Sequence, residues 1–223
     1  VAVLALGAFM SAMWMTRARP AIAMTPMTGQ TIPVSEASDR FTAWGTSGVT
    51  LYDADDSVAS WVQVLTAEGE RRREEEGWQP GVYDARAWDG SWRVKYAPHI
   101  RTLSTTLLST RFDIVYHIRG REIVSNVRYS NALLGKGWLN ASGSVDSLNA
   151  DDSEIVFEQF WVDGDVPQPS AAPDGSALGS AINRLGALGF VRGLSRFPVL
   201  WLDDKCCVFS FPPLGVNIAT VRE

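Results

Sequence analysis

From residue 91 onward, apolar and polar residues alternate with a period of two, which is typical of strands that bury one face. Turn residues such as Arg119-Gly120 separate the alternating stretches. The stretches cover residues 92–96, 112–118, 123–129, 139–145, 155–161, 197–202, 206–211 and 216–221. About eight short strands joined in this way predict an antiparallel barrel or sandwich over residues 91–221, and a closed barrel of that size leaves room for one small apolar ligand.

A helical pattern precedes the strands, over residues 53–76. Aspartates at positions 53, 55 and 56 suit an N-cap and a first helical turn, and an apolar stripe follows them. The stripe consists of Val58, Trp61, Val62 and Leu65. Residues 70–76 (ERRREEE) carry both signs of charge, so we expect a solvated helix end with intrahelical ion pairs, with a docking patch as the alternative.

The first fifteen residues carry no charge, and Arg17, Arg19 and Pro20 follow them. As a helix they would rise about 22 Å, short of the roughly 30 Å of a bilayer core. We expect residues 1–19 to form a membrane anchor, with the apolar core of a targeting peptide or a core-packed helix as alternatives. The side chains expected to hold it in the bilayer or against a partner are Leu4, Leu6, Phe9, Met13 and Trp14. If this segment spans the bilayer, the two arginines predict that the globular part lies on the cytoplasmic or stromal side.

Two further segments lack regular patterning. Residues 20–52 contain many Pro, Thr and Ser residues and are predicted to be an extended tether. Residues 163–195 interrupt the strands with Pro, Gly, Ala and Ser. Within this insertion, residues 178–194 fit a weak amphipathic helix, for which we expect a docking or membrane-facing role.

Composition narrows the function classes. The 223 residues carry a formal net charge of −5, which argues against a protein that mainly holds nucleic acid. With 46% hydrophobic and 20% charged residues the chain can bury an ordinary core, so disorder and a polytopic membrane protein are excluded. The nine tryptophans are the compositional oddity, because each is a large ring that must be buried or docked.

No residue set predicts catalysis or a metal site. The chain lacks G-x-S-x-G, P-loop and H-E-x-x-H motifs, and the adjacent Cys206 and Cys207 should point to opposite faces of a strand. We expect His99 to be a loop histidine and His117 to face outward, and Asp203-Asp204 to form a hairpin turn. The protein is therefore predicted not to be an enzyme, and an unrecognised enzyme that uses His99 is the alternative.

Several strand segments resemble a known family. Residues 90–97 (GSWRVKYA) are similar to the opening "G-x-W-x-v-x-Y" strand of the plastid lipid-associated proteins, also called plastid fibrillins. Residues 123–129 (IVSNVRY), 137–143 (GWLNASG) and 155–162 (IVFEQFWV) extend the resemblance, which covers roughly residues 53–223. The C-terminal end differs, because Cys206–Ser210 stand where the family has a basic turn.

The resemblance implies a lipocalin-like barrel in a plastid that binds lipids, quinones or pigments without catalysis. Combined with the apolar N-terminus, it suggests a thylakoid accessory protein of a photosystem or antenna complex, whose globular domain lies on the stromal side. The alternative is a soluble or peripheral carrier of lipid, quinone or pigment. No covalent cofactor is expected, and a bound lipid, chlorophyll, carotenoid or quinone would lie inside the barrel. The side chains expected to line this interior are Trp92, Val94, Phe112, Phe157 and Trp161.

Overall fold

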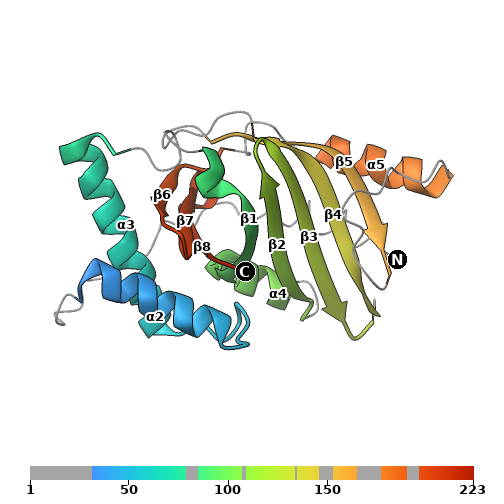
Figure 1. Cartoon of the computed structure of the whole chain (residues 1–223). Helices are drawn as coiled ribbons and strands as arrows, with labels where there is room; N and C mark the ends of the chain where they lie inside the picture. The colour runs from blue at the N-terminus through green and yellow to red at the C-terminus, as the bar shows by residue number, and fades with distance from the viewer. Residues whose placement is uncertain are drawn as a thin grey trace.

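Eight antiparallel strands form one sheet in the computed structural model, which describes residues 32–223 except 79–84, 107–108, 134, 146–152, 165–176 and 190–195. The strand order is β5-β4-β3-β2-β1-β8-β7-β6 (Figure 1). The strands are β1 (Gly90–Tyr96), β2 (Arg111–Arg119), β3 (Glu122–Asn131), β4 (Gly135–Val145), β5 (Ile155–Asp163), β6 (Val199–Leu202), β7 (Cys206–Phe211) and β8 (Val216–Arg222). The predicted mainly β, antiparallel, eight-stranded fold is confirmed.

Helices flank this sheet. They are α2 (Val34–Thr46), α3 (Asp56–Glu76), α4 (Pro98–Thr106) and α5 (Ala177–Gly189), with short 3-10 helices η1 (Ala85–Trp88) and η3 (Pro212–Leu214). Figure 1 shows α2 and α3 beside β6–β8, and α5 beside β5. Helix α2 falls within residues 20–52, where the sequence suggested only an extended tether, and α4 forms where a turn was expected. Composition hid α2, because Pro, Ser and Thr dominate that stretch while Phe41 and Ala37 supply its buried side.

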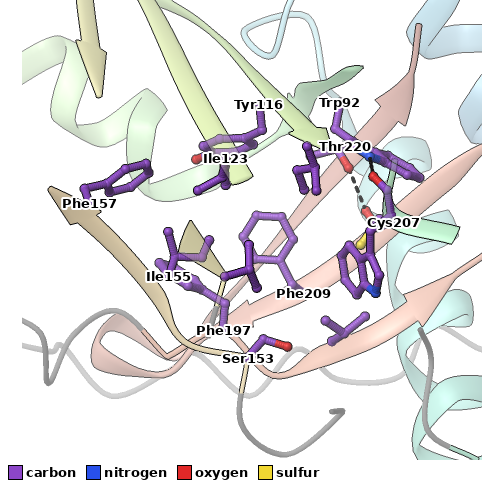
Figure 2. Close-up of a pocket in the computed structure, with 14 residues that line it drawn as sticks. Trp92, Tyr116, Ile123, Ser153, Ile155, Phe157, Phe197, Cys207, Phe209 and Thr220 are labelled. Carbon is purple, nitrogen blue, oxygen red and sulfur yellow. Dashed lines mark hydrogen bonds between the residues drawn. The ribbon is translucent and has the colours of Figure 1, made fainter. Parts of the chain in front are cut away.

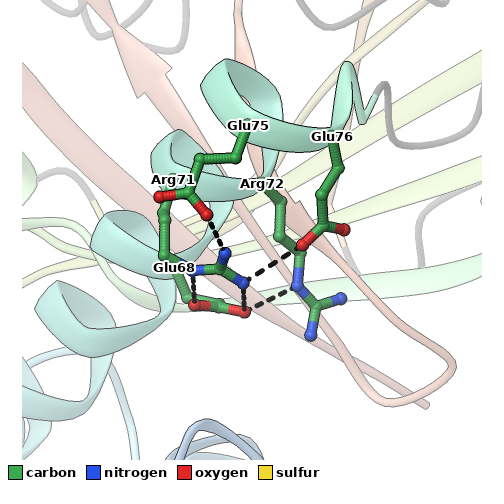
Figure 3. A network of polar contacts seen from close by, with 5 residues as sticks. All are labelled: Glu68, Arg71, Arg72, Glu75 and Glu76. Carbon is green, nitrogen blue, oxygen red and sulfur yellow. Dashed lines mark hydrogen bonds and ion pairs between the residues drawn. The ribbon is translucent and has the colours of Figure 1, made fainter.

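Helix α3 starts and ends at clear signals. The carboxylate of Asp55 accepts hydrogen bonds from the backbone N–H groups of Ser57 and Val58, and Gly77 ends the helix in the left-handed conformation with φ 63°. The charged end carries the predicted intrahelical pairs (Figure 3). Arg71 contacts Glu68 at 2.8 Å and Glu75 at 2.5 Å. These hydrogen bonds from Arg71, followed by those from Arg72, lower the pKa of Glu68 to about 2.

The two faces of the sheet bury different cores. The face that we call the helix face carries Val208, Ala219 and Val221, which pack with α2 and α3. The opposite face, which we call the inner face, carries Ile114 and Leu139 and packs against Ile100 of α4. The alternation in each strand therefore divides its residues between two separate apolar clusters.

Close approach fixes α3 on the sheet. A Cβ atom at Gly69 would lie 1.6 Å from the backbone oxygen of Leu200 in β6, so only glycine fits this crossing. Helix α2 is held by side chains: Ser38 donates to Asp203 at 2.6 Å, and Lys205 donates to Asp39 at 2.7 Å. Both helices are thus anchored to the β6–β7 hairpin.

The sheet is not closed, which corrects the expected barrel. In the described part of the chain the edge strands β5 and β6 meet only at an isolated bridge between Glu154 and Arg196, beside a 2.8 Å hydrogen bond from Phe197 N–H to the Ser153 carbonyl. Strand β6 has only four residues, and Pro198 just before it has no N–H to donate. Alternation in each strand carries no information about whether two distant edges will pair.

The predicted hydrophobic helix at residues 1–19 lies outside the described residues. Within the described ranges, no helix combines the length and apolar character needed to cross a bilayer. The membrane anchor and its side chains Leu4, Leu6, Phe9, Met13 and Trp14 stay predictions.

Candidate functional site

An apolar cavity lies on the inner face, where the two edges of the open sheet approach each other (Figure 2). Its volume is about 80 Å³. Ile155 and Phe157 reach it from the β5 edge, and Phe197 and Val199 reach it from the β6 edge. The remaining lining residues are Trp88, Trp92, Tyr116, Ile118, Ile123, Val145, Ser153, Cys207, Phe209 and Thr220.

The few polar groups around the cavity do not make it hydrophilic. Thr220 Oγ1 donates to the Cys207 carbonyl at 3.4 Å, and Trp92 Nε1 donates to the Trp88 carbonyl at 2.8 Å. Burial raises the pKa of Tyr116 to about 12, so its phenol stays neutral. The indole Nε1 of Trp88 is buried and has no hydrogen-bond partner among the described residues. The cavity therefore suits an apolar molecule.

Two of the predicted lining residues, Trp92 and Phe157, reach the cavity. Val94 and Phe112 lie on the same face of the sheet but pack into the core cluster with Ile100 of α4. The sequence predicted the face of these residues correctly. The sequence does not indicate which part of the inner face is filled by packed side chains and which part contains the cavity.

Trp161 lies on the other face, contrary to the predicted alternation along β5. The register pairs Gln159 with Ser142 but Phe157 with Gly143, so Glu158 is an extra residue in β5. This bulge shifts the period by one, and Phe160 turns inward in place of Trp161. Trp161 instead donates from Nε1 to Asp163 at 3.1 Å.

The C-terminal half of the lining was missed by sequence reasoning. Cys207 and Phe209 of β7 and Thr220 of β8 face the cavity because β8 pairs with β1. The alternation in these strands was visible, but nothing local indicated that the last strand lies next to the first. Trp88 lies in η1, just before β1.

His99 lacks the surroundings of a general base. It lies in α4, and its ring packs against Phe211 with the two centroids 5.7 Å apart. Burial alone lowers the pKa of His99 to about 4, and Nδ1 has no hydrogen-bond partner among the described residues. Among the described residues no charged group shifts this pKa, so the structure shows no carboxylate beside His99 that could pair with it in acid–base catalysis. His117, by contrast, is exposed as expected, with Nδ1 2.8 Å from Ser91 Oγ.

A second polar cluster surrounds Asp203 in the β6–β7 hairpin turn. Its carboxylate accepts hydrogen bonds from Ser38 at 2.6 Å, from Trp201 Nε1 at 3.0 Å and from the backbone N–H of Cys206 at 2.7 Å. Burial raises the pKa of Cys206 to about 12, so its thiol is protonated and a poor nucleophile. The hydrogen bonds to Asp203 therefore attach α2 to the hairpin turn. Cys206, the thiol of this cluster, is not an activated nucleophile.

Comparison with known proteins adds no constraint. The chain matches no protein-family model, no curated protein and no solved structure. Within the described ranges, no group of three His, Cys, Asp or Glu side chains could hold a metal ion. The resemblance to plastid fibrillins therefore stays a prediction, and the cavity geometry is the main guide to function.

Proposed function

We propose that this protein is a non-catalytic binder of one small apolar molecule, held on the inner face of the open sheet. The observation that supports this most directly is the apolar cavity between the β5 and β6 edges. A stable core normally leaves few voids, because each one forfeits contacts. A void with an almost wholly apolar lining is therefore a candidate ligand site.

The size of the cavity limits which ligands fit it. About 80 Å³ is well below the 300–1,000 Å³ of a typical site for a drug-sized ligand. A chlorophyll ring would require the edges to separate, whereas the end of an acyl or isoprenoid chain would not. Among lipids, quinones and pigments, the geometry therefore favours a lipid or quinone tail.

The junction between the edges offers a route of entry. Within the described residues, one isolated bridge between Glu154 and Arg196 joins the two edges, and the cavity residues Phe197 and Ile155 lie directly beside it. Separation at this point would expose the cavity without breaking the long ladders between the other strands.

The carrier role is favoured here over a structural role in a membrane complex. The latter depends on residues 1–19 and on the family resemblance, so the thylakoid location and the photosystem or antenna partners stay predictions. The two roles are compatible, because an anchored protein can also bind a lipid tail.

Titration with cis-parinaric acid, a fluorescent fatty acid, tests the proposal. We expect saturable binding at one site, detected by energy transfer from tryptophan. Ile155→Trp should abolish it, because the larger ring would fill the cavity. Trp92→Ala would be a poor test, since the same ring stabilises the fold.

The matched control is Val156→Trp. Val156 pairs with Ser144 on the opposite face of the same strand, so this variant should keep the site. Circular dichroism would verify that both variants fold. Absence of binding to the wild-type protein, or equal binding by the two folded variants, would exclude the cavity as the ligand site.

A further inference from the structure

A polar cleft of about 620 Å³ lies on the helix face, beside the C-terminal end of α2. The loop over residues 46–52 forms one wall. The other wall consists of side chains from three neighbouring strands: Arg93 and Lys95 of β1, Arg111 and Asp113 of β2, and Arg128 of β3. The cleft is separated from the apolar cavity by the thickness of the sheet, so the two sites are independent.

Positive charge predominates in this cleft. Its lining has four cations, Arg93, Lys95, Arg111 and Arg128, and two acids, Asp113 and Glu223, which gives 4 − 2 = +2 in a chain of net charge −5. Arg93 contacts both acids, each at 2.5 Å. Both carboxylates therefore lie on Arg93, and the other three cations give the cleft its net positive charge.

Two of those three cations face solvent. Arg111 lies over the ring of Tyr52 at 4.9 Å, and Arg128 lies 6.0 Å from the ring centroid of Trp138. Neither guanidinium has an ion-pair partner in the part of the chain that the structure describes. The aromatic rings orient the two guanidinium planes, and the guanidinium N–H groups stay available to donate to a ligand. Asp53 interacts electrostatically with Arg111, and its carboxylate also accepts hydrogen bonds from Thr50.

Lys95 is the buried member of the set. It is only 7% exposed, and its ammonium donates to the Val49 carbonyl at 2.6 Å. The pairing of Val94 with Thr220 and of Tyr96 with Ala219 makes Lys95 the bulged residue of β1. A Cβ at Gly45 of α2 would lie 3.3 Å from Lys95 Cγ, so the helix covers the lysine stem. A buried ammonium with one carbonyl acceptor is costly unless an anion compensates it.

We propose that this cleft binds an anionic group of the phosphate class, held by Lys95, Arg111 and Arg128. Guanidinium groups contact phosphate oxygens through paired N–H donors, and the lysine supplies a point charge at the base of the cleft. Burial, followed by the nearby charge of Arg93, lowers the pKa of Lys95 in the unbound protein. A bound anion would raise that pKa again.

Free phosphate and a lipid headgroup share this chemistry. A feature of the neighbouring hairpin helps to distinguish the two sources. Leu133 is 77% exposed in the turn between β3 and β4, and Ser130, which lines the cleft, pairs with both Arg111 and Lys136. Leu133 and the cations of the cleft thus lie at the same end of the sheet. A lipid headgroup bound in the cleft would therefore bring Leu133 to the bilayer surface.

The full chain would be titrated with inorganic phosphate, and separately sedimented with phosphatidylcholine vesicles with and without phosphatidylglycerol. We expect saturable binding to at least one anionic probe. The double variant Arg111→Gln, Arg128→Gln should weaken it about tenfold or more, because two charge-assisted contacts are lost. The control, Arg40→Gln with Arg119→Gln, removes the same charge from exposed positions outside the cleft and should bind as the wild type does.

A second measurement makes the assignment specific. The NMR signal of the Lys95 side chain should report a higher pKa when the anion is bound, and Lys95→Met should weaken binding in a folded protein. Phosphate binding without vesicle binding identifies free phosphate as the source. Vesicle binding that Leu133→Ser also weakens identifies a headgroup. If neither anionic probe binds, or if the control variant loses as much affinity as the cleft variant, the proposal is overturned.

Discussion

Strand β1 separates two sites of opposite chemistry. Trp92 points to a small apolar cavity on the inner face, while its neighbour Arg93 and the bulged Lys95 line a larger polar cleft on the helix face. The cavity sits at the junction of two strand edges, and the cleft lies where α2 stops covering the sheet. Each site therefore lies where an element of the fold ends, the cavity between two sheet edges and the cleft beyond the last turn of α2, and neither site contains a sequence motif.

The two sites also differ in what their residues contribute to folding. The rings around the cavity are part of the core, because Trp92 packs with Trp88, Val199 and Cys207. Two arginines of the cleft lie at the surface, and Lys95 is buried with no ion pair to any carboxylate that the structure describes. Substitutions should therefore affect stability strongly on the inner face and weakly in the cleft.

Trp92→Ala should have the largest effect, a loss of about 3–5 kcal/mol in the free energy of unfolding. Trp92 is 2% exposed, and the guanidinium of Arg222 lies 4.5 Å from its ring centroid. Urea unfolding would measure the loss. Trp92→Phe, which keeps a ring, should lose clearly less, and equal losses would contradict the packing role.

Gly143→Ala should cost about 3 kcal/mol, the upper end for overpacking. A Cβ at this position would lie 1.8 Å from the Val156 carbonyl oxygen, at the bulge that sets which β5 residues face the cavity. Ser142→Ala, one residue earlier and on the other face, is the control. Similar midpoints of thermal unfolding for the two variants would argue against the close approach.

Protonation of His99 should remove about 2 kcal/mol of stability between pH 7.5 and pH 5. Burial places the folded pKa near 4, whereas the unfolded chain takes up a proton near pH 6.5. The unfolded state therefore binds more protons in this window, and stability falls as the pH drops. Urea unfolding of the wild type and of His99→Phe at both pH values isolates the effect, because the variant should lack this part of the pH dependence.

Lys95→Met should have the smallest effect, a change of less than about 1 kcal/mol at neutral pH. Its apolar stem is retained beneath α2, and loss of the buried charge offsets loss of the hydrogen bond to Val49. Together with Trp92→Ala, this variant compares the two faces on one strand. A loss as large as that of Trp92→Ala would mean that the ammonium is essential to the fold.

Most of the fold could be predicted from local patterns of apolar and polar residues. Period-two alternation located the eight strands, and the acids at positions 53–56 marked the start of α3. What it missed depends on distant partners: the bulge at Glu158 forms against β4, and closure depends on whether β6 is long enough to pair with β5. Of the residues that line the cavity, the sequence predicted only Trp92 and Phe157. The cleft could not be predicted, because Lys95, Arg111 and Arg128 come together only through strand order.

The adjacent cysteines provide a built-in way to observe each face separately. Cys206 is buried on the helix face and Cys207 on the inner face, and burial raises the pKa of both thiols, to about 12 for Cys206. Neither thiol should react with an alkylating reagent until its own side of the sheet opens. In the Cys206→Ala or Cys207→Ala variant, the alkylation rate of the remaining thiol measures how often one face of the sheet opens. Ligands of the cavity and of the cleft could then be ranked by the opening motion that each suppresses.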